Sequence, residues 1–257
     1  MLQNKIANKL LAERHPMWLT VTLHLLPGLL IVAVYLLLAA PLTKSLGLPP
    51  FIGWVISLCL ALVPTQLGLL LWLGYQQNKR FSFDGVVHFL DKPISTRKLA
   101  ILVVPLILWF LAIGIALIPL DELVYKSLFQ WVPFEGAGGG MSTILQGYPR
   151  NVMIISLAAC IPLTGLLLPF IEELYFRGFL MPRLPASGIW HPVFSSILFS
   201  FYHFWTPWGF LSRVAYLLPA FYFVWRKKDL RISIWTHVGT NFILQTVGTI
   251  VLIFTKS

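Results

Sequence analysis

The segment that decides the fold is Leu168–Leu180, which reads LPFIEELYFRGFL. It places two adjacent carboxylates, Glu172 and Glu173, inside an apolar run of the chain. All other acidic residues of the chain fall in tails or in loops between apolar runs. A charged side chain at the centre of a membrane helix costs about 2.5–3.5 kcal/mol on insertion scales. The pair is therefore the first candidate for a functional site.

The composition agrees with a membrane location. The chain has 257 residues, of which 58% are hydrophobic and 11% are charged, whereas soluble domains carry about 25% charged residues. A soluble fold of this size could not hide so much apolar surface. The net charge of +10 comes from basic residues between apolar runs, so it gives no reason to expect nucleic acid as a partner. The sequence predicts an all-α, polytopic transmembrane helical bundle.

Apolar runs that could cross the bilayer need about 20 residues. We expect seven such spans, and an eighth only if part of 121–150 inserts, against which its acidic residues argue. Most of the Lys and Arg residues lie in alternate gaps, which predicts a cytoplasmic N-terminus and an extracytoplasmic C-terminus. The amphipathic segment 75–98 is expected to lie along the cytoplasmic interface. The predicted spans are 17–40, 51–74, 99–120, 151–170, 189–206, 209–225 and 232–254.

The helical phase gives the two glutamates different roles. Successive residues of a helix differ by about 100°, so Glu173 and Arg177 share a face and can pair. Glu172 points elsewhere, which leaves its carboxylate free to face a cavity and to act as a general base. The alternative is that both glutamates share Arg177 in a purely structural ion-pair cluster.

Two histidines lie well inside the later apolar runs. His203 follows Phe199 by one turn, and His237 precedes Asn241 by one turn, so each pair occupies one helical face. With tilted helices, the depths of these residues allow them to converge with Glu172 in the cytoplasmic half of the bilayer. A pair of Glu residues, two His residues and an Asn on three polar-bearing helices therefore indicate a functional site.

These motifs resemble the CPBP family, also called Abi, which includes the type II CAAX prenyl endopeptidases and bacteriocin-processing or immunity proteins. The motifs are Glu172-Glu173-x-x-x-Arg177, Phe199-x-x-x-His203 and His237-x-x-x-Asn241. The resemblance covers roughly 151–250, so we expect an N-terminal membrane region, 1–150, and a catalytic helical core, 151–257. It implies an intramembrane endopeptidase acting on a membrane-associated peptide or protein.

The resemblance also implies a role for each site residue. Glu172 would activate water with help from His203, and His237 and Asn241 would stabilise the oxyanion. The supporting residues would be Glu173, Arg177 and Phe199. The family is often described as metalloproteases, and a metal-independent glutamate mechanism is also argued for it. We assign no metal to the site. A zinc ion would take His203, His237 and Glu172 as its ligands.

Two departures from the pattern of the prenyl endopeptidases concern the substrate. Thr206 stands where they carry a second His, and Tyr202 stands where they tend to have a small residue. Both put a prenylated CAAX substrate in doubt. The main alternative function is a non-catalytic membrane scaffold or an immunity or regulatory protein of the same family. A proton-coupled transporter is a further alternative, although the polar groups occupy only the second half of the chain.

Overall fold

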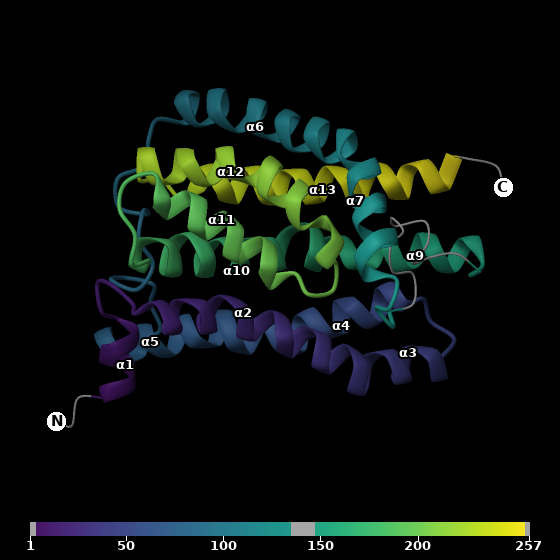
Figure 1. Cartoon of the computed structure of the whole chain (residues 1–257), viewed down its shortest axis with the longest axis horizontal. Helices are drawn as coiled ribbons and strands as arrows, with labels where there is room; N and C mark the ends of the chain where they lie inside the picture. Colours follow the sequence, from purple (N-terminus) through teal and green to yellow (C-terminus); the bar gives the residue numbers. More distant parts are fainter. Residues whose placement is uncertain (1–3, 135–146, 255–257) are drawn as a thin grey trace.

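The computed structural model describes residues 4–134 and 147–254, and within them the chain forms helices and no strands. The first half runs from α1 (Lys5–Leu10) to η3 (Tyr125–Phe129) and the second from α9 (Arg150–Cys160) to α13 (Arg231–Phe254). The helices lie roughly parallel or antiparallel in one bundle, and the two ends of the chain lie at opposite ends of it (Figure 1). The helices of the first half are α1, α2 (Met17–Val34), η1 (Tyr35–Ala39), α3 (Ala40–Ser45), α4 (Pro50–Leu62), η2 (Val63–Gly68), α5 (Leu69–Asn78), α6 (Thr96–Ala116), α7 (Ile118–Val124) and η3. Those of the second half are α9, η4 (Ile161–Leu167), α10 (Leu168–Glu172), η5 (Glu173–Leu180), η6 (Met181–Arg183), α11 (Trp190–Tyr202), η7 (Pro207–Gly209), α12 (Phe210–Lys227) and α13.

Five continuous helical stretches are long and apolar enough to cross a membrane. They are Met17–Ser45, Pro50–Asn78, Thr96–Ala116, Arg150–Arg183 and Arg231–Phe254. Large apolar side chains on their outer faces are exposed, as lipid contact requires. Five of the seven predicted spans coincide with these stretches. The other two coincide with α11 and α12, of 13 and 18 residues, which do not meet the same criteria.

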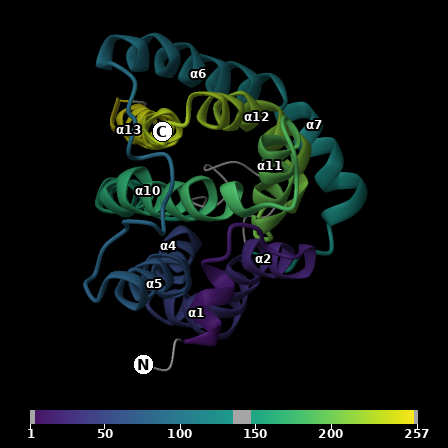
Figure 2. The same ribbon diagram turned by 90° about the vertical axis from the view of Figure 1, so that its left-hand side faces the viewer.

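The helix that carries the glutamate pair lies at the centre of the bundle. Every side chain from Ile171 to Met181 is buried, so this part of the helix has no lipid-facing side. Figure 2 shows α10 between a layer containing α12 and α13 and a layer containing α2, α4 and α5. Two π-helical stretches, η4 and η5, flank α10, and such stretches are frequent at functional sites.

The prediction of one continuous span over 189–206 was wrong at its C-terminal end. Helix α11 ends at Tyr202, and the chain turns through 203–209 before α12 begins. Pro207 disfavours helical conformation at the residue before it, which is a local cause of the break. A tertiary contact also fixes this end: a Cβ on Gly28 of α2 would lie 2.0 Å from the carbonyl oxygen of Tyr202. Only a glycine allows α2 to approach that carbonyl so closely.

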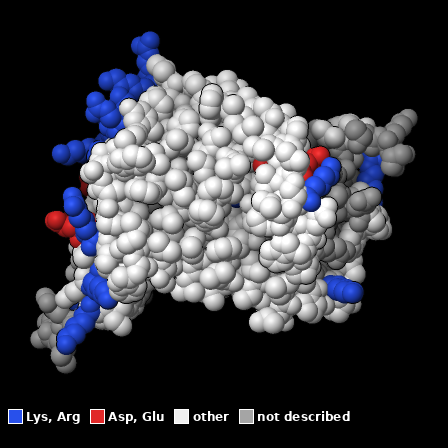
Figure 3. Space-filling model, viewed as in Figure 1, with Lys and Arg blue, Asp and Glu red and all other residues white. Residues whose placement is uncertain are grey.

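The segment predicted to lie along the interface, 75–98, is divided in the structure. Helix α5 continues to Asn78 and ends at Lys79, which has a φ of 57°. Beyond it, the loop buries Val86 and Val87 against the ends of the helices. Arg183 donates to the carbonyl oxygen of Val86 at 3.1 Å. The apolar residues of this loop therefore pack onto the bundle, and many of the basic side chains gather at the same end of the molecule (Figure 3).

The predicted extracytoplasmic loop, 121–150, begins as helix. Asp121 lies in the first turn of α7, where its Oδ2 accepts a hydrogen bond from Ser212 Oγ at 2.8 Å. Residues 135–146 of this loop lie outside the described part of the chain.

Candidate active site

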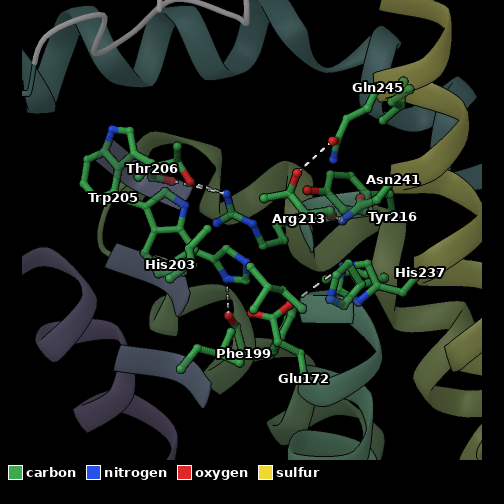
Figure 4. Close-up of a pocket in the computed structure, with 18 of the residues that line it drawn as sticks. Glu172, Phe199, His203, Trp205, Thr206, Arg213, Tyr216, His237, Asn241 and Gln245 are labelled. Carbon is green, nitrogen blue, oxygen red and sulfur yellow. Dashed lines mark hydrogen bonds and ion pairs between the residues drawn. The ribbon is translucent and has the colours of Figure 1, made fainter. Parts of the chain in front are cut away.

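A cavity of about 610 Å³ opens beside Glu172, and we call it the Glu172 cavity. Five of the seven predicted site residues line it (Figure 4). Glu173 and Arg177 lie behind the wall and do not reach it. The two halves of the chain both contribute, because α4 and α6 supply aromatic and aliphatic lining. The predicted residues on the wall are Glu172, Phe199, His203, His237 and Asn241.

Glu172 is the last residue of α10 and is 6% exposed, with its carboxylate on the cavity side. The Tyr202 hydroxyl hydrogen-bonds to it, and the same hydroxyl accepts a hydrogen bond from Gln66 Nε2 at 3.3 Å. Neither Arg177 nor any other Arg or Lys of the described residues forms an ion pair with Glu172. Its carboxylate is therefore held in place while it stays available to a molecule in the cavity.

Glu173 is fully buried and makes the contact that helical phase predicts. Arg177 Nη1 lies 3.1 Å from Glu173 Oε1. The guanidinium group is held between two aromatic rings, with its centre 3.9 Å from the ring of Phe199 and 3.8 Å from that of Phe221. Charge and packing together fix this arginine.

His237 of α13 joins the two glutamates. Its Nδ1 lies 2.7 Å from Glu173 Oε1, and its Nε2 lies 3.9 Å from Glu172 Oε2. Since an ionised carboxylate only accepts hydrogen bonds, Nδ1 carries a proton. Nε2 is then an acceptor in the neutral ring and a donor in the protonated ring. The sequence had placed Glu173 only beside Arg177, because helical phase says nothing about which residue of α13 comes next to it.

His203 lies at the C-terminal end of α11, where the chain leaves the helix. Its Nδ1 is 2.8 Å from the carbonyl oxygen of Phe199, which can only accept, so Nδ1 is protonated. In the neutral ring, Nε2 is then an acceptor. The ring packs against Phe199 and Trp205, with centroid distances of 4.7 Å to each.

Asn241 lies one turn beyond His237 on α13, and its Nδ2 donates to the carbonyl oxygen of Thr164 at 3.4 Å. That carbonyl is available for a local reason. The N–H of Leu168 bonds to Leu163 in the π pattern, and the next residue, Pro169, has no N–H to offer Thr164. Pro169 thus leaves the Thr164 carbonyl oxygen available to Asn241, and this hydrogen bond holds the asparagine side chain in place.

Arg213 is the residue that sequence reasoning missed. In the count of basic residues per gap, Arg213 was assigned to the gap between the fifth and sixth predicted spans, outside the membrane. In the structure it lies in α12, is 8% exposed and lines the Glu172 cavity. It donates to the hydroxyl of Thr206 at 2.7 Å and to the carbonyl oxygen of Ser200 at 3.3 Å. The available signal was its position in an apolar run, four residues into the predicted sixth span.

The residues do not group as a metal site. Among the described residues, no three His, Cys, Asp or Glu side chains come together closely enough to hold a metal ion. In particular, His203, His237 and Glu172 do not form such a set.

Comparison with known proteins gives one match. Residues 153–243 match the family model described as type II CAAX prenyl endopeptidase Rce1-like. No curated protein and no solved structure matches the chain. The matched stretch contains the glutamate pair, Arg177, both cavity histidines and Asn241, so this part of the chain is similar to the type II CAAX prenyl endopeptidases of the CPBP family.

Proposed function

We propose that the protein is an intramembrane endopeptidase that hydrolyses a peptide bond of a membrane-associated peptide or protein. One observation carries the proposal. Of two adjacent buried glutamates, one is paired with arginine and histidine, and the other faces a cavity with His203, His237 and Asn241. A scaffold that needed only a buried ion pair would have no use for the second carboxylate.

The proposed reaction begins with a water held between Glu172 and His203. The Glu172 carboxylate takes a proton from the water, whose oxygen attacks the carbonyl carbon of the substrate peptide bond. The negative charge that develops on the carbonyl oxygen faces Asn241 Nδ2–H and the protonated Nε2 of His237. Glu172 then returns its proton to the leaving amine as the C–N bond breaks.

Glu173 and Arg177, behind the cavity wall, and Phe199, on it, are proposed to support this reaction. Glu173 accepts from His237 Nδ1 and so fixes the imidazole ring, and Arg177 and Phe199 fix Glu173. We also propose that 151–257 is the catalytic core and that 1–150 is a membrane region that closes the cavity. Phe51, Trp54 and Leu62 of α4 support this division, since they form part of the cavity lining.

The description of the matched family suggests a prenylated CAAX protein as substrate. Thr206 takes part in a hydrogen bond with Arg213 at the cavity wall, which is a different arrangement from the second histidine that the prenyl endopeptidases carry there. We therefore propose the broader class of membrane-associated peptides, with prenylated peptides as the first probe.

The deciding experiment is a cleavage assay with purified protein in liposomes. Wild type is expected to cut a membrane-anchored peptide, and Glu172→Gln is expected to lose turnover while its thermal unfolding stays unchanged. Activity is expected to persist in a chelator, since no step uses a metal. A folded wild type that binds peptide without cutting it would favour the scaffold or immunity function instead. Activity lost in a chelator and restored by zinc would overturn the metal-free mechanism.

Seven crossings, with a cytoplasmic N-terminus and an extracytoplasmic C-terminus, complete the proposal. Five of them are the long apolar helices, and the remaining two are α11 and α12, which pack against each other in the bundle. Reporter fusions after residues 80 and 228 are both expected to lie in the cytoplasm. An extracytoplasmic reporter at either position contradicts this arrangement.

A further inference from the structure

Arg213 differs from the other arginine at the site, Arg177, in having no carboxylate partner. Arg177 pairs with Glu173 at 3.1 Å, whereas no Asp or Glu within 4–134 or 147–254 forms an ion pair with Arg213. Both guanidinium groups are buried, but only that of Arg213 lines the Glu172 cavity. Figure 4 shows this group next to Thr206, on the cavity wall above the ring of His203.

The hydrogen-bond partners of the Arg213 guanidinium are all neutral. It donates to the carbonyl oxygens of Ser200 and Thr206 at 3.3 and 3.4 Å, and to the Thr206 hydroxyl at 2.7 Å. It also hydrogen-bonds to the phenol of Tyr216. One acidic residue, Asp121, lies near this group: it accepts a hydrogen bond from Ser212 and attracts Arg213 through space without forming an ion pair.

A buried cation whose hydrogen-bond partners are all neutral is costly unless an anion contacts it directly, and Asp121 attracts Arg213 only from beyond ion-pair distance. The planar guanidinium group matches a carboxylate well, because two N–H groups can donate to its two oxygens. An anion at Arg213 would lie in the same cavity as Glu172, and repulsion from Glu172 would keep it at the arginine end.

We propose that Arg213, assisted by Thr206, binds a carboxylate of the substrate and so sets which peptide bond reaches Glu172. This inference rests on the proposed function, and it assigns Arg213 a role in substrate positioning. In a peptide the carboxylate is either the free C-terminus or an Asp or Glu side chain, and both present the same group to the guanidinium.

The test uses three prenylated peptides that end in a CAAX box. The first has a free C-terminal carboxylate and no acidic side chain, the second is its C-terminal amide, and the third is the amide with a Glu as last residue. Cleavage is measured with wild type and binding with Glu172→Gln, so that affinity is obtained even without turnover. Arg213→Gln is tested in both backgrounds.

With Arg213 present, we expect the free acid to bind roughly 10- to 100-fold more tightly than the amide, as for a charge-assisted hydrogen bond. The preference is expected to appear in KM with little change in kcat. Arg213→Gln is expected to bring the ratio of acid to amide close to one. Recovery of binding by the third peptide would identify the side-chain carboxylate as an acceptable source, and no recovery would identify the C-terminus.

A matched control is Arg183→Gln. Arg183 is also buried and donates only to carbonyl oxygens, those of Val86 and Phe179, but it does not line the cavity. This variant is expected to keep the wild-type ratio. Because each ratio is taken within one protein, a general loss of folding or activity in Arg213→Gln does not imitate the expected result, and Arg213→Lys, which keeps the charge, is expected to retain part of the preference.

Two outcomes overturn the inference: equal binding of acid and amide by the protein with Arg213, or a preference that Arg213→Gln retains. The second outcome would mean that Arg213 only holds the backbone of residues 200–206 in place. A preference for the acid that depends on Arg213, without any cleavage by wild type, would support the carboxylate site and contradict the proposed protease.

Discussion

The two adjacent glutamates of the α10–η5 helix lie in different electrostatic surroundings. On the side of Glu173, the buried carboxylate pairs with Arg177 and accepts from His237 Nδ1, and aromatic rings lie on both faces of the guanidinium. On the side of Glu172, a carboxylate and the unmatched Arg213 face a common cavity. The difference shows that adjacent identical residues can have different roles: the Glu173 side holds the helices together, and the Glu172 side is the one that we propose for the substrate.

The most direct test of this comparison is to remove the negative charges of Glu172 and Glu173 separately. Glu173→Gln leaves Arg177 buried without its partner, and breaking a buried pair in this way costs about 3–5 kcal/mol. Glu172→Gln removes a charge that no arginine or lysine balances, so its unfolding temperature in detergent should stay close to that of wild type. Glu122→Gln, which breaks an exposed pair with Lys126, is the control and should change stability little. Equal destabilisation by the two central variants would mean that both glutamates form one structural cluster.

Asn241 tests the Glu172 side alone. Removing one oxyanion donor typically lowers kcat by about 10²–10³, so Asn241→Ala should show a loss of this size with nearly unchanged KM. The same variant frees the Thr164 carbonyl, which is a minor effect on stability because water in the cavity can replace the amide. Steady-state kinetics with thermal unfolding distinguishes the two effects. A rise in KM alone would assign Asn241 to binding rather than to the reaction.

The position of His203 at the cavity depends on where α11 ends. Gly28→Ala would place a methyl group against the Tyr202 carbonyl, and such overpacking typically costs about 1–3 kcal/mol. Since His203 follows Tyr202 directly, activity should fall together with stability. Gly248→Ala is the matched control, because no atom lies within 4 Å of a Cβ at that helical position. Stability lost equally in both variants would contradict the close approach of α2.

The smallest effect is expected far from the cavity, at the Asp229–Arg231 pair. Burial alone would raise the pKa of Asp229, but hydrogen bonds from Arg231 and from the Ile94 N–H outweigh it and hold the pKa below its usual value. The pair therefore stabilises the folded protein above the unfolded pKa of about 3.9 and loses this contribution as the pH falls through the lower folded value. Asp229 is buried, and Asn keeps an acceptor oxygen but loses the charge, so Asp229→Asn should cost about 1 kcal/mol at pH 7, the difference between charge-assisted and neutral hydrogen bonds, and the difference from wild type should shrink in acid.

Much of this arrangement could be predicted from the residues. Helical phase correctly separated Glu172 from Glu173 and paired Glu173 with Arg177, because both effects depend only on residues within one helix. The convergence of Glu172, His203 and His237 on one cavity also followed from their depths in the apolar runs. The first two predictions rest on geometry within one helix, and the third rests on how deep each residue lies in its own apolar run.

The features that could not be predicted depend on contacts between helices. The contact between His237 and Glu173 joins residues far apart in the chain, and the end of α11 depends on Gly28 of α2. Arg213 was assigned to a loop because a count of basic residues per gap cannot recognise a buried arginine that donates to a neighbouring backbone. The roles of all these residues in turnover remain predictions for the kinetics above.

The short helix α11 has a consequence for how the protein enters the membrane. Its 13 residues span about 20 Å, less than the roughly 30 Å of a hydrocarbon core. The irregular backbone after it is tolerable at that depth only where protein satisfies its polar groups, and Arg213 of the following helix does so for Ser200 and Thr206. Helices α11 and α12 should therefore insert during synthesis as a single hairpin rather than one after the other. A ribosome-bound chain that has released α11 but not yet α12 should still hold this segment accessible to water-soluble reagents.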